Sequence, residues 1–124
     1  MSISGIDKDS CMLRDLFLGF IRVHILFHAA EAPVYGTALM AELGRHGYRV
    51  GPGTLYPILH SLEQDGLLRR EARVVNGRVR KYYRATPAGQ RHLGRAQAQL
   101  RELAGEVLPP PAPLKRRGAV GRGR

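Results

Sequence analysis

The sequence has little of several features that would point to other classes of protein. Its 124 residues include one cysteine, Cys11, so a disulfide within the chain and a Cys-rich zinc site are both excluded. A lone cysteine fits a reducing compartment, and we expect a cytoplasmic, nucleoid-associated protein. The apolar run LFLGFIRVHILF is too short for a bilayer, which needs about 20 apolar residues, and Arg22 and His24 interrupt it. No membrane partner is therefore expected.

Acidic residues are scarce as well. Ten Asp and Glu face twenty Lys and Arg, which gives a formal charge of +10, and no acid follows residue 108. The last sixteen residues, PPPAPLKRRGAVGRGR, carry five of the basic side chains. A basic domain with a basic tail indicates a polyanionic partner, nucleic acid first and an anionic membrane second, with simple solubility as the alternative.

The sequence also lacks the patterns on which enzymes depend. It shows no paired carboxylates, no phosphate-binding glycine loop and no nucleophile elbow. We therefore expect no catalytic residues and no cofactor.

Hydrophobic periodicity predicts three helices in the first half of the chain. The first, from about Met12 to Ala30, is apolar nearly all round, so it should be buried both in its own core and against a second surface. TALMAELGRHG predicts a shorter second helix that ends near Gly47. Pro52 suits the first turn of a third helix, because its missing N–H would be unpaired there in any case.

The third helix, GTLYPILHSLEQDGLL, has one apolar edge and an uncharged opposite side. Leu55, Ile58, Leu59 and Leu62 fall at i, i+3, i+4 and i+7 and predict a buried stripe. With that stripe on the core, the other side can enter a DNA major groove. The residues predicted to bind DNA on this side are Gly53, Thr54, Tyr56, Pro57, His60, Ser61 and Gln64.

Strand periodicity follows Gly66. Leu67–Val75 and Arg78–Ala85 flank Asn76-Gly77, the signature of a two-residue type I′ turn in a β-hairpin. Seven basic residues crowd onto this hairpin beside a single acid, which favours phosphate contact and insertion near the minor groove. Tyr82 and Tyr83 point to opposite faces, and the sequence does not say which is inside. The hairpin residues predicted to bind DNA are Asn76, Arg78, Arg80 and Lys81.

Thr86 and Pro87 form an N-cap and first-turn pair that opens a last helix, predicted to run to about Leu108. Its apolar residues follow the 3-4-3-4 spacing of a short coiled coil. We expect this seam to hold two copies of the chain together as a homodimer. Its members are Leu93, Ala96, Leu100, Leu103 and Val107.

These elements predict a mainly α fold with a small β-hairpin, a winged helix-turn-helix followed by a C-terminal dimerisation helix. The expected segments are a flexible N-terminus (1–11), a winged-helix DNA-binding domain (12–86), the dimerisation helix (87–108) and a disordered basic tail (109–124). The tail is expected either to reach phosphates as an electrostatic arm or to be solvated without a role.

GTLYPILHSLEQDGLL followed by RKYYRATPAG resembles the PadR family of bacterial transcriptional regulators over roughly Leu13 to Leu108. Gly51 and Thr37 depart from that family's common residues. The resemblance implies a promoter operator as double-stranded DNA partner, a repressor role for a homodimer, and release by a small, hydrophobic effector. Some relatives hold planar aromatic ligands between subunits; without tryptophan, such a pocket here would use Phe17 or Phe20.

Two alternatives remain open. His24 and His28 are four residues apart, a spacing that could serve a metal-sensing winged-helix repressor, with Cys11 as a further candidate ligand. Without acidic or cysteine neighbours at matching spacing, aromatic packing is favoured for both histidines, and no metal ligands are predicted. The second alternative is a winged-helix protein-interaction module, against which the strongly basic hairpin argues.

Overall fold

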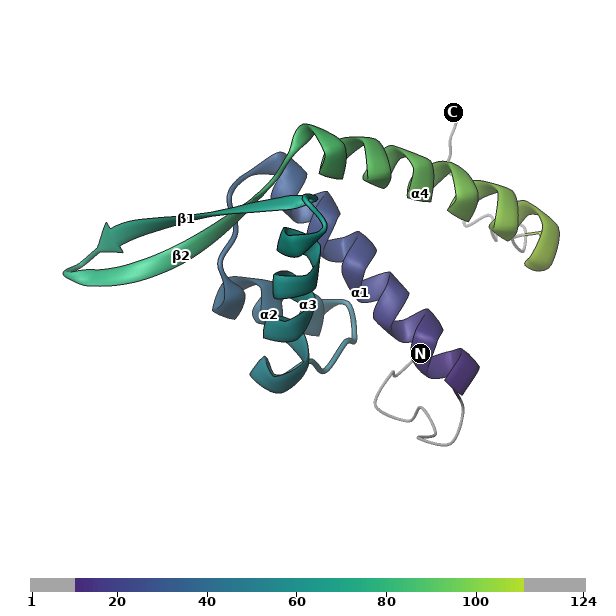
Figure 1. The fold of residues 1–124 in the computed structure, drawn as a ribbon. Coiled ribbons are helices and arrows are strands. Elements are labelled where there is room, and N and C mark those ends of the chain that lie inside the picture. Colours follow the sequence, from purple (N-terminus) through teal and green to yellow (C-terminus); the bar gives the residue numbers. More distant parts are fainter. Residues whose placement is uncertain (1–10, 111–124) are drawn as a thin grey trace, which may run out of the picture.

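The structure is a computed structural model that describes residues 11–110. Residues 1–10 and 111–124, which hold most of the predicted N-terminal segment and basic tail, lie outside the described part. The elements in chain order are α1 (Cys11–Glu31), α2 (Gly36–Arg45), α3 (Pro52–Gln64), β1 (Leu68–Val75), β2 (Arg78–Ala85) and α4 (Pro87–Val107). This is the predicted winged helix-turn-helix arrangement with a long C-terminal helix (Figure 1).

One apolar stripe from each of the first three helices builds the core. The stripe predicted for α3 is confirmed, since Leu55 and Leu59 are fully buried and Ile58 and Leu62 nearly so. Because these side chains recur every three or four residues, they share one face of the helix and leave the opposite face to solvent. The stripes that meet them are Ile21, Ile25, Leu26 and Ala29 of α1 and Leu39 and Leu43 of α2.

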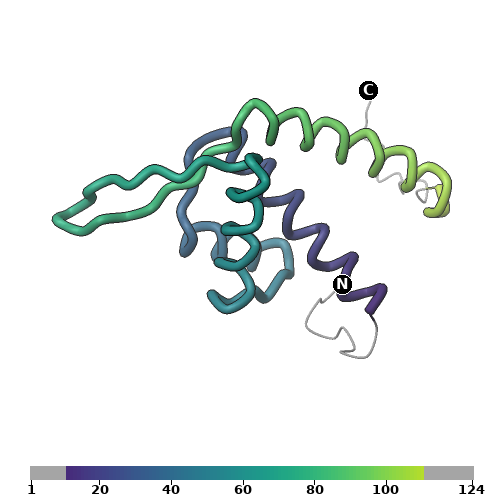
Figure 2. Tube along the Cα trace, viewed as in Figure 1, coloured from purple at the N-terminus to yellow at the C-terminus, as the bar shows by residue number. Residues whose placement is uncertain are grey.

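The hairpin, which we call the wing, extends away from the helical body (Figure 2). Asn76 and Gly77 both adopt positive φ, 52° and 77°, as the predicted type I′ turn requires. The base of the wing is fixed to the segment before α2, because Val34 and Tyr83 exchange two backbone hydrogen bonds of 2.9 and 2.7 Å. Tyr83 is the buried tyrosine, and Tyr82, on the opposite face of the strand, is only half-buried.

The helix α4 begins with the predicted cap. The Thr86 hydroxyl accepts a hydrogen bond from the Gly89 N–H at 3.0 Å and donates one to the Gly66 carbonyl at 2.6 Å. The first bond caps α4, and the second holds its first turn against the chain that leads into the wing. Beyond this turn α4 runs away from the body, and α1 and α4 diverge along their length (Figure 1).

One member of the predicted dimerisation seam is corrected by the structure. Leu93 is only 8% exposed and belongs to the core of its own protomer. The apolar stripe of α4 is continuous in the sequence, but its first part packs on the body and only its later part is exposed. The start of α4 is thus part of the winged-helix core rather than a separate segment.

None of the four described helices combines the length and the apolar character that a membrane crossing requires.

Candidate nucleic-acid interface

The side of α3 that faces away from the core carries no charged residue before Glu63. Six of the seven residues predicted to bind DNA there are exposed, and Ser61 is half-buried. The face offers hydroxyl, amide and imidazole groups, which can donate or accept hydrogen bonds at base edges. The exposed six are Gly53, Thr54, Tyr56, Pro57, His60 and Gln64.

The N-terminal half of α3 is unusually open on its outer side. Gly51 at the N-cap provides no side-chain hydrogen bond, and an added Cβ at Gly51 or Gly53 would meet nothing within 4 Å. Pro57 lies inside the helix and has no N–H to donate to the Gly53 carbonyl four residues earlier. Small side chains and an unused backbone acceptor allow another molecule to approach this end closely.

Tyr56 lies over Gly36, the first residue of α2. A Cβ at Gly36 would fall inside the Tyr56 ring and hydroxyl, so only glycine permits this packing. The tyrosine remains 39% exposed, and its hydroxyl lies at the junction of α2 and α3. The contact holds the two helices of the helix-turn-helix in register and keeps a hydrogen-bonding group at the surface.

Acids offset only part of the positive charge of the wing. Glu71 pairs with Arg73 at 2.8 Å and lies 4.0 Å from Arg84, and the hydrogen bond from Arg73 lowers the pKa of Glu71. Arg70 pairs with Glu63 of α3 at 3.6 Å. Within residues 11–110, no ion pair involves the remaining cations of the outer wing, which are Arg78, Arg80 and Lys81. These three cations are therefore available to an anion.

Aromatic rings hold two of the wing arginines in place. The Arg80 guanidinium lies 4.2 Å from the centre of the Tyr35 ring, and Arg73 lies 4.8 Å from that of Tyr82. Tyr35 and Tyr82 meet edge to face at 5.3 Å, so the four side chains form one continuous cluster. Arg73 and Arg80 are cross-strand partners, and stacking on separate rings lets two like charges occupy opposing positions. Stacking orients Arg80 without neutralising it.

An open cleft of about 710 Å³ lies between the wing, the start of α2 and the exposed side of α3. It brings together residues predicted to bind DNA from two separate parts of the sequence. From α3 come Tyr56 and His60, and from the wing come Asn76, Arg78, Arg80 and Lys81. The five other predicted residues of α3, which do not line this cleft, are Gly53, Thr54, Pro57, Ser61 and Gln64.

The cleft also contains residues that the sequence did not predict, notably Tyr35 and Thr37. No local pattern marks them. Tyr35 and Thr37 flank the start of α2 and reach the cleft only because Val34 pairs with Tyr83 of the wing. A sequence pattern within one helix or one hairpin could not have predicted that these residues line the cleft.

A second surface lies between α1 and α4 and is apolar. A groove of about 290 Å³ there is lined by Leu16 and Phe20 of α1 and by Ala96, Leu100 and Leu103 of α4, among others. Leu103 and Val107 are 51% and 62% exposed. Side chains of this size are rarely left in water as a continuous stripe.

The two phenylalanines considered for an effector pocket lie apart. Phe20 lines the groove between α1 and α4, whereas Phe17 is not among the residues that line it. Phe17 instead packs against Tyr48, with the ring centres 5.8 Å apart. Of the two, Phe20 is the one positioned for a ligand in this groove.

Comparison with known proteins places this architecture in a family. Residues 25–95 match the model of the family described as "Transcriptional regulator PadR-like family". The chain belongs to this PadR family. Transcriptional regulator Rv3488 of Mycobacterium tuberculosis H37Rv is 57% identical over 96 residues, which cover 77% of this chain and 90% of the relative.

Solved structures agree with the assignment. A PadR family transcriptional regulator from Eggerthella lenta has a TM-score of 0.69 at 38% identity, with 77% of this PadR chain and 85% of the other covered. A PadR-like transcription factor from Bacteroides fragilis has a TM-score of 0.70 at 30% identity, with 79% and 96% covered. The PadR chain is thus a transcriptional regulator rather than an enzyme, and membership implies DNA binding.

Proposed function

We propose that this PadR-family chain is a repressor that binds a promoter operator as a homodimer. The observation that carries the proposal is the basic cleft, in which the exposed side of α3 adjoins Arg78, Arg80 and Lys81. A duplex is recognised by hydrogen-bonding groups that reach base edges and by cations, not neutralised by acids, that reach phosphates. The site of action would be the cytoplasm, at the nucleoid.

In this proposal α3 reads the major groove. Gly53, Thr54 and Pro57 allow close approach, and hydrogen bonds to base edges or phosphates come from His60, Ser61 and Gln64. The wing lies along the adjacent backbone, with its Asn76-Gly77 tip near the minor groove. The two elements then have separate roles, α3 in sequence choice and the wing in overall affinity.

The homodimer would form through the apolar surfaces of α1 and α4. Leu100, Leu103 and Val107 are exposed along one side of α4, and Leu16 and Phe20 lie across the groove from it. A second copy would bury these side chains, which at about 25 cal/mol per Å² of apolar surface favours association. Two chains related by a twofold axis would present two copies of α3 to an inverted repeat.

A small hydrophobic effector would act at the same place. The groove that Phe20 lines adjoins the proposed dimer surface, so a ligand there would alter how two protomers sit against each other. Operator binding needs two α3 helices at a fixed separation. A ligand that changes this separation would weaken the binding of the dimer to DNA, and the dimer would leave the promoter.

Selection from a pool of random duplexes tests this function. The tag-free protein is incubated with the pool, bound DNA is recovered and amplified over several rounds, and a parallel series without protein corrects for amplification bias. We expect enrichment of an inverted repeat whose half-sites are about 34 Å apart, one helical turn, or a multiple of it. Recovery of DNA with no shared sequence would contradict an operator-specific role.

A further inference from the structure

Three histidine side chains meet where α1 crosses the end of α2. His24 and His28 are one turn apart on α1, and His46 is the C-cap residue of α2. Each offers one ring nitrogen, and the three nitrogens lie within 4.8 Å of one another. The sequence showed only the pair on α1, because His46 is brought to it by the packing of α2 on α1.

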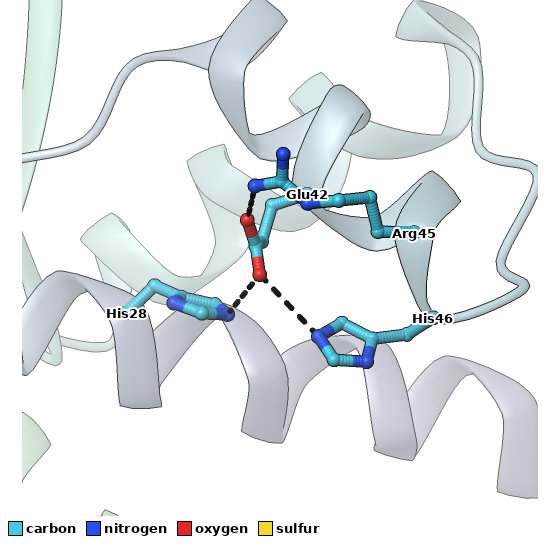
Figure 3. Close-up of polar contacts among 4 residues, drawn as sticks. All are labelled: His28, Glu42, Arg45 and His46. Atoms are coloured by element: carbon cyan, nitrogen blue, oxygen red, sulfur yellow. Dashed lines mark hydrogen bonds and ion pairs between the residues drawn. The ribbon is translucent and has the colours of Figure 1, made fainter.

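Glu42 supplies the acidic neighbour that the sequence spacing did not reveal. One of its carboxylate oxygens lies 3.7 Å from His28 Nε2 and 3.3 Å from His46 Nε2 (Figure 3). The other carboxylate oxygen is paired with the Arg45 guanidinium. Figure 3 shows the carboxylate between the two imidazole rings, with Arg45 on its far side. Such an outer partner fixes the orientation of a carboxylate ligand.

The spacing of these groups fits one small metal ion. With metal–nitrogen bonds of about 2.0–2.1 Å, the ligand atoms of a tetrahedral zinc site lie roughly 3.3 Å apart. Glu42 already lies near that separation from both His28 and His46. The three nitrogens, within 4.8 Å, need rotations of the rings and a shift of roughly 1.5 Å at most to reach it.

The burial of one ring nitrogen also suits a metal. His28 Nε2 is buried and has no hydrogen-bond partner among the described residues.

We propose that His24, His28, His46 and Glu42 form a binding site for one divalent transition-metal ion. Three imidazoles and one carboxylate suit zinc, cobalt, nickel or copper better than calcium or magnesium, which prefer oxygen ligands. Cys11 does not take part, because it lies thirteen residues before His24 on the same helix, roughly 20 Å away.

A bound ion would tie α2 to α1. These helices otherwise meet through core side chains such as Leu39 and Ile25, and the cluster lies at the surface edge of that contact. Because α2 also carries Gly36 beneath Tyr56, the metal would fix the base on which α3 rests. That consequence for DNA depends on the proposed function, whereas metal binding itself does not.

Titration of the tag-free full-length protein with Co²⁺, followed by its visible absorption, tests the site without DNA. We expect one ion per chain, an absorption spectrum typical of tetrahedral cobalt, and displacement by Zn²⁺. His46→Gln should weaken binding by about tenfold or more, as is usual when a metal site loses a ligand or its support. Since His46 is exposed, this variant should keep the fold, which circular dichroism would verify.

The matched controls are His92→Gln and Cys11→Ser. His92 is an exposed histidine of α4 whose ring nitrogen contacts the Ala88 carbonyl of its own helix, and Cys11 is exposed at the start of α1. Both variants should bind Co²⁺ as the wild type does, and Zn²⁺ should raise the melting temperature of both by more than it raises that of His46→Gln. Absence of stoichiometric binding, or equal affinity in wild type and His46→Gln, would overturn the proposal.

Discussion

Gly89 lies where the chain from the wing turns into α4, directly against the Leu67 carbonyl. A Cβ at this position would overlap the carbonyl oxygen and carbon, which are backbone atoms and cannot rotate away. We predict that Gly89→Ala lowers the free energy of unfolding by about 1–3 kcal/mol, because the first turn of α4 must move off the body. Urea denaturation followed by circular dichroism measures the change.

Gly94 provides the control on the same helix. It is exposed, and an added Cβ would meet nothing within 4 Å. Gly94→Ala should therefore raise stability by up to about 1 kcal/mol through helix propensity alone. All proteins are compared at one concentration, since self-association shifts apparent stability. Equal effects of the two substitutions would mean that the close approach at Leu67 is not a constraint.

At the same scale, the two tyrosines of β2 show what a strand pattern can predict. Alternation puts Tyr82 and Tyr83 on opposite faces but does not say which face is covered. Tyr83 is the buried tyrosine because the backbone of Val34 pairs with it and holds it against the segment before α2. Val34 is distant in sequence and belongs to no local pattern. Which of the two tyrosines is buried therefore depends on pairing between distant segments, and this pairing is seen only in the folded chain.

Among the elements, α4 shows both the success and the failure of periodicity. Its 3-4-3-4 spacing correctly predicted one helix with one apolar stripe, and Thr86 and Pro87 correctly predicted its start. The spacing could not divide the stripe into a buried and an exposed part, because a leucine in the core of its own chain and an exposed leucine look alike in sequence. Leu93 lies in the core while Leu103 is exposed, since α1 and α4 diverge between them (Figure 1).

This exposed part of α4 carries the next prediction. Leu100→Glu combined with Leu103→Glu should give monomers, because two carboxylates would be buried in the proposed interface without partners. Operator affinity should fall by roughly a hundredfold or more, since a single half-site loses the gain of simultaneous binding. Sedimentation velocity measures the oligomeric state, and fluorescence anisotropy measures the affinity.

The matched control for this pair is Gln99→Glu, which adds a carboxylate to α4 without removing an apolar side chain. Gln99 lines the same groove and is exposed, but it is already polar. The variant should stay dimeric if apolar burial, rather than the charge of α4, drives association. A double leucine variant that sediments as a dimer would show that the interface lies elsewhere.

For the whole molecule, the proposed function depends on separate roles for two elements: α3 selects the DNA sequence, and the wing contributes overall affinity. The sequence predicted both surfaces, since an uncharged helix face and a basic hairpin are local features. It could not show that they share one cleft, nor that His46 and Glu42 join the histidines of α1, because those proximities follow from the packing of separate elements. Local patterns therefore predict each element, whereas the residues that share a cleft or a cluster are known only from the contacts between elements.

The most direct test measures binding of the selected operator and of a scrambled duplex across several salt concentrations. The proteins are wild type, Gln64→Ala for α3, Arg78→Ala for the wing, and Arg101→Ala as a charge-matched control on the exposed later part of α4. Each lost phosphate contact lowers the slope of log affinity against log salt by about 0.9, so the two wings of a dimer contribute roughly two.

We predict that Arg78→Ala weakens binding to both duplexes and makes the salt dependence shallower, because phosphate contacts carry no sequence information. Gln64→Ala should reduce the preference for operator over scrambled DNA by about 1–3 kcal/mol, the range of one base contact, with the salt slope unchanged. Arg101→Ala should resemble the wild type. An Arg78→Ala protein with altered preference and intact affinity for scrambled DNA would contradict the assignment of these roles.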